Sequence, residues 1–198
     1  MGRKRIHDDR LRERLLDAAG QRLVEHGISG LSLRNLAADA GTSTAAVYSL
    51  FGGKPALLSA LHERAFQRFG DHLAAIGISD DPTEDAVRLG LAYRASAIAD
   101  PNGYQIMFGG EVRLDQVSRT VRDAGAKTFL PLLDAVRRCL VAGHFRNEAP
   151  AEVIATALWA NVHGLVSLEL ADFLPPHAAS PADFFETAVR ATVRGWAA

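Results

Sequence analysis

Several side chains between Ser32 and Lys54 are of the types that contact nucleic acids. Arg34 carries a planar guanidinium that can donate two hydrogen bonds to a guanine edge. The Tyr48 hydroxyl and the Lys54 ammonium suit phosphate oxygens. Ser32 precedes a helical pattern, and the free backbone N–H groups at a helix start also bind phosphate. We therefore interpret this stretch as a candidate DNA-contacting segment, with a surface salt bridge as the alternative for Arg34.

The apolar residues around these side chains recur at the spacing of two short helices. Ser32 is the expected N-cap of the first helix and Ser43 that of the second, and Gly41 separates them. Two short helices joined by a tight turn containing glycine form a helix-turn-helix pattern, although any all-helical protein can contain such a pair. The apolar positions are Leu33, Leu36, Ala37 and Ala40 in the first helix and Val47, Leu50 and Phe51 in the second.

The surroundings of the two helices support this interpretation. A preceding amphipathic segment, residues 8–26, supplies apolar positions that can close a three-helix core. Thr44, Ala45 and Ala46 are small, which would let the second helix approach the floor of a DNA groove, with Ser49 assisting Tyr48 at the backbone. The residues that we expect to contact DNA are Arg3, Lys4, Arg5, Ser32, Arg34, Ser43, Thr44, Ala45, Ala46, Tyr48, Ser49 and Lys54.

The first three of these residues form a basic cluster within Gly2–Asp9, a polar lead that we expect before the first helix. One interpretation is an arm that reaches the minor groove or the flanking phosphates. The other is an unstructured, solubilising terminus.

Residues 8–62 resemble the DNA-binding domain of the TetR family of one-component transcriptional regulators, in the run LLDAAGQRLVEHGISGLSLRNLAADAGTSTAAVYSLFGGKPALLSAL. The chain departs from the family at Leu50, where a polar or aromatic residue is usual, so base preference cannot be carried over. The resemblance implies that Tyr48 and Lys54 contact the DNA backbone. The shared landmarks are Gly27, Leu33, Leu36, Ala37, Gly41, Val47, Tyr48, Phe51, Lys54 and Leu57.

Composition and helical periodicity indicate an all-α protein. The resemblance implies an N-terminal helix-turn-helix DNA-binding domain and a C-terminal helical ligand-binding and dimerisation domain. The chain has 198 residues, 48% of them hydrophobic, and a net charge of −1 that conceals a basic excess through Lys54 and an acidic excess after it. A single cysteine, Cys139, and the absence of a secretory signal fit a cytoplasmic location. The apolar run Val153–Leu168 is too short and too polar for a membrane span.

We expect three parts: a DNA-binding domain with its basic arm over residues 1–54, a connecting helix over 55–75, and a ligand-binding and dimerisation domain over 83–198. Trp159, His163 and Gly164, together with the run DPNGYQIMFGGE, resemble a TetR subclass named for its Trp-His-Gly motif. The resemblance implies a homodimer formed through the two C-terminal helices, about 151–170 and 181–196, that reads a near-palindromic operator. It implies a repressor that a small, mostly apolar molecule releases from DNA.

Aromatic and soft side chains in the C-terminal part would suit a ligand pocket, although such residues also build cores. No metal-ligand spacing, cofactor loop or catalytic motif is visible, so we expect neither an enzyme nor a cofactor. A helical adaptor without specific DNA binding is the alternative function. The candidate pocket residues are Tyr93, Tyr104, Met107, Phe108, Phe129, Trp159 and His163.

Overall fold

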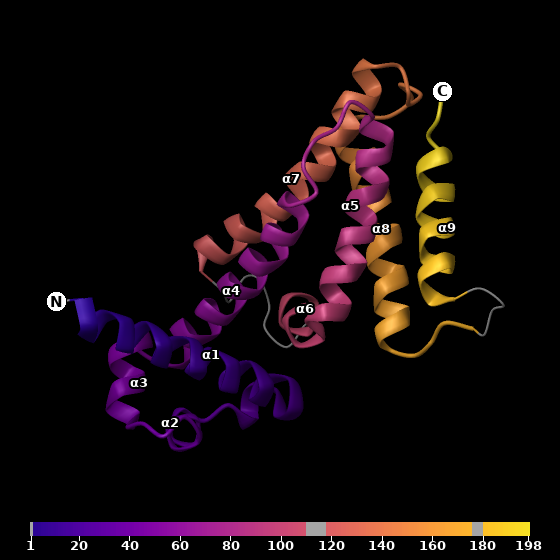
Figure 1. The fold of residues 1–198 in the computed structure, drawn as a ribbon. Helices are drawn as coiled ribbons and strands as arrows, with labels where there is room; N and C mark the ends of the chain where they lie inside the picture. The colour runs from indigo at the N-terminus through magenta and orange to yellow at the C-terminus, as the bar shows by residue number, and fades with distance from the viewer. Residues whose placement is uncertain (1, 110–117, 176–179) are drawn as a thin grey trace. The chain divides into compact units, whose positions relative to one another are not determined.

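The structure is a computed structural model that describes residues 2–109, 118–175 and 180–198. Within these ranges the regular structure is helical apart from one isolated β-bridge between Phe145 and Ala197, so the predicted all-α class is confirmed. The helices are α1 (Gly2–Gly30), α2 (Leu33–Asp39), α3 (Thr44–Phe51), α4 (Lys54–Ala74), α5 (Pro82–Ala99), α6 (Pro101–Phe108), α7 (Arg119–Val141), α8 (Ala151–Leu170) and α9 (Pro181–Arg194) (Figure 1).

The chain forms two compact units, and neither is continuous in sequence. The first unit comprises Met1–Arg68 and Pro101–Gly125, and the second comprises Phe69–Asp100 and Ala126–Ala198. The helix α6 therefore groups with the N-terminal helices, because it packs on α1. At that contact a Cβ atom on Gly20 would lie 3.4 Å from Ile106 Cδ1. This division differs from the three consecutive parts expected from the sequence.

The first helix is longer than the sequence pattern predicts. It begins at Gly2, so the backbone of the expected polar lead is helical, and it extends to Gly30 with a kink at Gly27, where φ is 64°. Beyond the kink the chain folds closely on itself, since a Cβ atom on Gly30 would lie 2.3 Å from His26 Cβ. Only glycine fits that position without a shift of the backbone.

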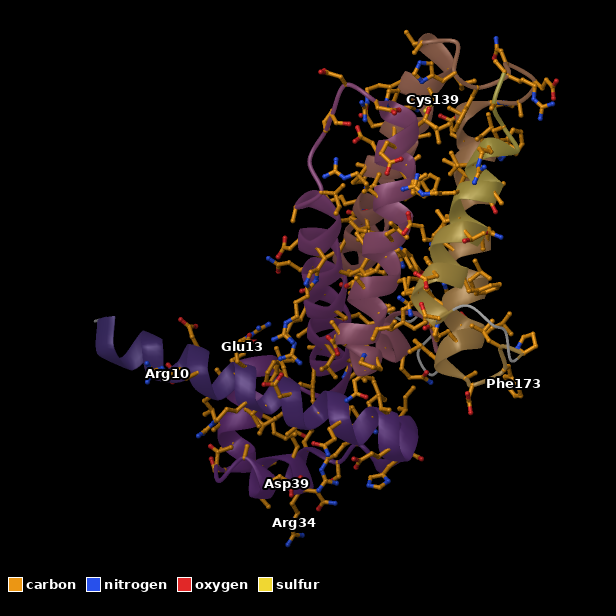
Figure 2. All side chains as sticks on the ribbon, turned by 45° about the vertical axis from the view of Figure 1, so that its right-hand side comes forward. Arg10, Glu13, Arg34, Asp39, Cys139 and Phe173 are labelled. Carbon is orange, nitrogen blue, oxygen red and sulfur yellow. The ribbon has the colours of Figure 1, made fainter. Side chains whose placement is uncertain are left out.

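The second unit is built around α5, which packs against α8 and α9. Gly90 lies at the tightest point, where an added Cβ atom would be 3.0 Å from Val189 Cγ1 and 3.3 Å from Val162 Cγ2. Figure 2 shows Cys139 and Phe173 at opposite ends of this helical bundle. Ion pairs join the same helices, Arg94 with Glu169 and Arg190 with Glu84.

One buried carboxylate connects three segments of the second unit. Asp85 is 1% exposed and accepts hydrogen bonds from Ser79 N at 2.9 Å, Ser79 Oγ at 2.7 Å and an Arg138 guanidinium nitrogen at 2.8 Å. Burial by itself would raise the pKa of Asp85. The hydrogen bonds from Ser79 and Arg138 outweigh burial and lower that pKa to about 2. Asp85 is therefore ionised, and it fastens the α4–α5 loop and α7 to α5.

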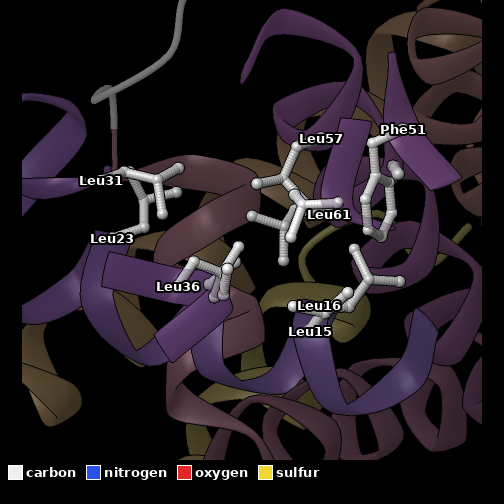
Figure 3. Close-up of a cluster of buried hydrophobic side chains, with 12 residues drawn as sticks. Leu15, Leu16, Leu23, Leu31, Leu36, Phe51, Leu57 and Leu61 are labelled. Atoms are coloured by element: carbon white, nitrogen blue, oxygen red, sulfur yellow. The ribbon is translucent and has the colours of Figure 1, made fainter. Parts of the chain in front are cut away.

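The first unit has its own hydrophobic core, to which α1, α2, α3 and α4 each contribute (Figure 3). The partners come from distant parts of the chain, so this core fixes how the two short helices sit on α1 and α4. Its largest side chains are Leu15, Leu16, Leu23, Leu31, Leu36, Phe51, Leu57 and Leu61.

Candidate nucleic-acid interface

The helices α2 and α3 form the predicted helix-turn-helix. Ser32 Oγ accepts a hydrogen bond from Asn35 N, and Ser43 Oγ accepts one from Ala46 N, so both predicted N-caps are confirmed. Gly41 adopts a φ of 62° in the turn, a conformation that glycine reaches without strain. Thr42 N donates to Ala37 O at 2.9 Å and closes the end of α2. The two helices pack on each other and are positioned by the core beneath them.

The face of this motif that lies opposite the core presents most of the predicted contact residues. Arg34 is exposed and points away from the first unit (Figure 2). In the described ranges its guanidinium has no hydrogen bond or ion pair, so the salt-bridge alternative is not realised there. Tyr48 is 54% exposed. Ser43, Ala45 and Ser49 are also exposed, and Ser32, Thr44 and Ala46 are half-buried.

Lys54 differs from the other predicted contacts. It is half-buried, and its ammonium donates a hydrogen bond to the backbone carbonyl of Ile28, 26 positions earlier in the chain. Arg3, Lys4 and Arg5 lie in the first turns of α1, but their side chains are outside what the structure describes. For these four residues a DNA contact stays a prediction.

Two arginines outside the predicted contact residues fasten the end of α2 to α1. The Arg22 guanidinium pairs with the Asp39 carboxylate at 2.5 Å, and an Arg14 guanidinium nitrogen donates to Ala40 O at 3.4 Å. Both cations meet the C-terminal end of α2, where backbone carbonyls carry negative partial charge. No short-range spacing could have revealed these contacts, because the partners are far apart in the sequence.

The seven candidate pocket residues form two groups, one in each unit. In the second unit the Tyr93 hydroxyl and His163 Nδ1 share a hydrogen bond of 2.8 Å. The Trp159 ring lies 6.0 Å from the His163 ring and 6.0 Å from the Phe129 ring, centroid to centroid. Burial lowers the pKa of His163, so this imidazole is neutral near pH 7.

The remaining three candidates pack together in the first unit. The Phe108 ring lies 5.1 Å from that of Tyr104 and 6.1 Å from that of Phe66, centroid to centroid. Met107 packs against the same cluster of Phe66 and Val121. Tyr104 is buried, which fits a core role, and a ligand contact for these side chains stays a prediction.

The described residues contain no group of three His, Cys, Asp or Glu side chains that could hold a metal ion. His62 is 1% exposed, and its Nδ1 donates to the Leu58 carbonyl at 2.8 Å. Burial lowers the pKa of His62 more than its contacts with backbone carbonyls raise it. We therefore interpret His62 as a neutral core residue.

The apolar helix near the C-terminus is longer than the predicted run Val153–Leu168, because α8 spans Ala151–Leu170. This helix has 20 residues and, by length and composition alone, is long and apolar enough to cross a membrane. A single helix of this kind is weak evidence for a membrane span, because core helices of soluble proteins share the same properties. In the single chain, 28% of the most apolar 18-residue stretch of α8 is buried.

The fold and the exposed face of α2 and α3 define a protein of the helix-turn-helix class. Residues 15–61 match the family described as bacterial regulatory proteins, tetR family, and residues 86–192 match the tetracyclin repressor-like C-terminal domain. The chain belongs to the TetR family of transcriptional regulators, whose typical role is ligand-responsive repression.

The chain is similar to known proteins over nearly its whole length. The HTH-type transcriptional regulator Rv1816 of Mycobacterium tuberculosis is 24% identical, over 86% of this chain and 85% of that protein. A solved protein of unknown function from Rhodococcus sp. RHA1 has a TM-score of 0.81 and 29% identity, covering 95% and 96% of the two chains. PfmR, a TetR family regulator from Thermus thermophilus, shares the fold with a TM-score of 0.73 at 20% identity, over 91% of this chain and 97% of its own.

Proposed function

We propose that this chain is a cytoplasmic repressor that binds a near-palindromic DNA operator as a homodimer and leaves it when a small, mostly apolar molecule binds. The observation that carries DNA binding is the exposed guanidinium of Arg34, which has no partner among the described residues and belongs to α2, the helix that packs on α3. A guanidinium without an internal partner is available for a bidentate contact to guanine. The same observation argues against the alternative of a helical adaptor, which would leave this arrangement without a role.

The proposed DNA face consists of exposed and half-buried residues at the starts of α2 and α3 and along α3. Ser32 and Ser43 use their hydroxyls as helix caps, so their contribution would come from the backbone N–H groups around them. Tyr48 and Ser49 would meet phosphates and set the register, whereas Thr44, Ala45 and Ala46 would lie against base edges. Lys54, whose ammonium donates to the Ile28 carbonyl in the chain without DNA, would meet a backbone phosphate at the start of α4.

The dimer is supported by an apolar face of α8 that the described residues of the single chain leave uncovered. Val153 is 53% exposed and Leu168 is 45% exposed, and Ala157 and Ala160 are exposed between them on the same side of the helix. An apolar face of this kind usually marks an interaction site. A second copy that packs its α8 and α9 on these residues would bury the face. The dimer would then place two helix-turn-helix motifs on the two half-sites of an operator.

The proposed effector would contact the group formed by Tyr93, Phe129, Trp159 and His163. These side chains combine apolar rings with one hydrogen-bonded polar pair, the composition that ligand sites favour. Trp159 is 37% exposed and is the member most accessible to a ligand. The same group supports the proposed likeness of this domain to the Trp-His-Gly subclass.

Selection of bound sequences from a random DNA pool, followed by fluorescence anisotropy on the selected operator, tests this function. We expect Arg34→Ala to weaken operator binding by about 1 to 3 kcal/mol and to relax the base preference at one position in each half-site. Lys127→Ala, which removes an exposed cation from α7 in the second unit, is the matched control and should leave binding unchanged. Enrichment of no sequence over random DNA at moderate salt would contradict the proposal.

A further inference from the structure

The segment that we expect to contact DNA contains a single acidic side chain. Asp39 is the only aspartate or glutamate between Ser32 and Lys54 in the sequence. It is the last residue of α2, and Arg34 lies in the first turn of the same seven-residue helix (Figure 2). A negative charge beside DNA opposes binding, because the phosphates repel it. The presence of a carboxylate in this motif therefore indicates a role other than contact with the DNA backbone.

The carboxylate of Asp39 is held by α1. Nε and a terminal nitrogen of the Arg22 guanidinium both lie 2.5 Å from Asp39 Oδ2. The side chain of Arg22 is 24% exposed and that of Asp39 is 44% exposed, so the ion pair is partly shielded from water. At the next residue along the chain, Ala40 O accepts a hydrogen bond from Arg14 at 3.4 Å. Two arginines of α1 thus hold the C-terminal end of α2.

A helix as short as α2 takes its direction from its surroundings. Seven residues are too few for a stable helix in isolation, so packing and end contacts must orient it. Leu36 and Ala37 bury one face of α2 in the core of the first unit. The ion pair with Arg22 then restrains the end of the helix, where a cation also complements the last carbonyls. Because α3 packs on α2, the direction of α2 affects both short helices.

We propose that Asp39, through its ion pair with Arg22, is a positioning residue for DNA recognition. The pair sets the direction of α2, and with it the placement of Arg34 and of α3 in the groove. Arg22 also neutralises the carboxylate and so reduces its repulsion by the phosphates. This inference rests on the proposed DNA-binding function and adds to it a residue that acts through α2 instead of touching DNA.

Asp39→Ala separates positioning from charge, because the two effects have opposite signs. The loss of a negative charge alone would tighten binding to any duplex. We expect the variant to bind the selected operator about fivefold more weakly than the wild type does, with unchanged or tighter binding to a random-sequence duplex in the same buffer. Fluorescence anisotropy on the two duplexes measures both affinities. Asp39→Glu keeps the carboxylate and should retain most of the wild-type ratio of operator to random-sequence affinity.

Asp9→Ala is the matched control. Asp9 is an exposed aspartate of α1, and within the described ranges no ion pair joins it to α2. Its replacement removes the same charge from the same unit and should not weaken operator binding.

Three results would overturn the positioning role. The first is operator binding by Asp39→Ala that equals or exceeds that of the wild type. The second is an equal loss of affinity for both duplexes, and the third is a lower melting temperature with an unchanged ratio of affinities, which would show a merely structural ion pair. If Asp39→Ala does not fold, Arg22→Gln breaks the same pair from α1, and its ratio of affinities gives the same decision.

The wild-type chain distinguishes this proposal from the function on which it rests. If it selects no operator, the proposed function fails and the positioning role fails with it. If it binds its operator and Asp39→Ala binds equally well, the positioning role alone fails.

Discussion

At the scale of single residues, the ionisation of Asp85 makes stability depend on pH. Its carboxylate is buried and accepts hydrogen bonds from Ser79 and Arg138, which hold its pKa at about 2 against an ordinary value of 3.8. A carboxyl whose pKa is lowered by folding stabilises the folded state above the ordinary pKa. That stability is lost as the pH falls through the folded value, so we place the loss between about pH 4 and pH 2.

Asp85→Asn should lower the free energy of unfolding at pH 7 by about 2 kcal/mol, because a neutral amide accepts hydrogen bonds from Ser79 and Arg138 more weakly than a carboxylate does. The variant should also lose the part of the acid sensitivity that falls between about pH 4 and pH 2. Urea unfolding at a series of pH values measures both effects. Asp134→Asn removes the other, exposed carboxylate that pairs with Arg138 and should change little. Equal pH dependence in Asp85→Asn and the wild type would contradict this assignment.

At the scale of elements, the close approach of α5 to α8 and α9 depends on the missing side chain of Gly90. An alanine there would place its Cβ atom 3.0 Å from Val189 Cγ1, and both neighbouring valines are stiff and buried. Overpacking costs about 1 to 3 kcal/mol, which exceeds the roughly 1 kcal/mol that alanine gains over glycine in a helix. We therefore expect Gly90→Ala to lower the free energy of unfolding by about 1 kcal/mol.

Gly70→Ala in α4 is the matched control, since its Cβ atom would meet Thr128 Cγ2 at an ordinary 3.6 Å. This variant should be neutral or more stable than the wild type. Thermal melts of both variants test the comparison. A Gly90→Ala protein as stable as Gly70→Ala would mean that α8 or α9 shifts to accommodate the methyl group.

At the scale of the whole molecule, the uncovered face of α8 determines the expected assembly. Ala157→Arg would place a charge in the middle of the proposed subunit interface, where a buried, unpaired cation is costly. We expect the variant to be monomeric in analytical ultracentrifugation at concentrations where the wild type is a dimer. It should bind the full operator much more weakly, while its affinity for a single half-site should be nearly unchanged.

Ala126→Arg makes the same change at an exposed position of α7 and should leave the assembly intact. A wild-type protein that sediments as a monomer at micromolar concentration would contradict the proposed dimer. A dimeric Ala157→Arg would instead move the interface to another face.

The sequence by itself determined the local structure of the candidate site. The periodicity around Leu36 and Val47, the caps at Ser32 and Ser43 and the break at Gly41 depend on neighbours within one or two helical turns. These features predicted α2 and α3, and the exposure of Arg34 and Tyr48 follows from their positions opposite the apolar stripe. The pattern failed at the start of α1, because polarity alone does not prevent residues 2–9 from extending a helix.

Only the tertiary structure decided which distant groups meet. Lys54 looks like a free cation in the sequence, and its partner Ile28 becomes visible only when α1 and α4 pack together. The same holds for Arg22 with Asp39, for the grouping of α6 with the first unit, and for the division of the candidate pocket residues between the units. Contacts between remote segments leave no periodic signal in the chain, because packing of the two hydrophobic cores creates them.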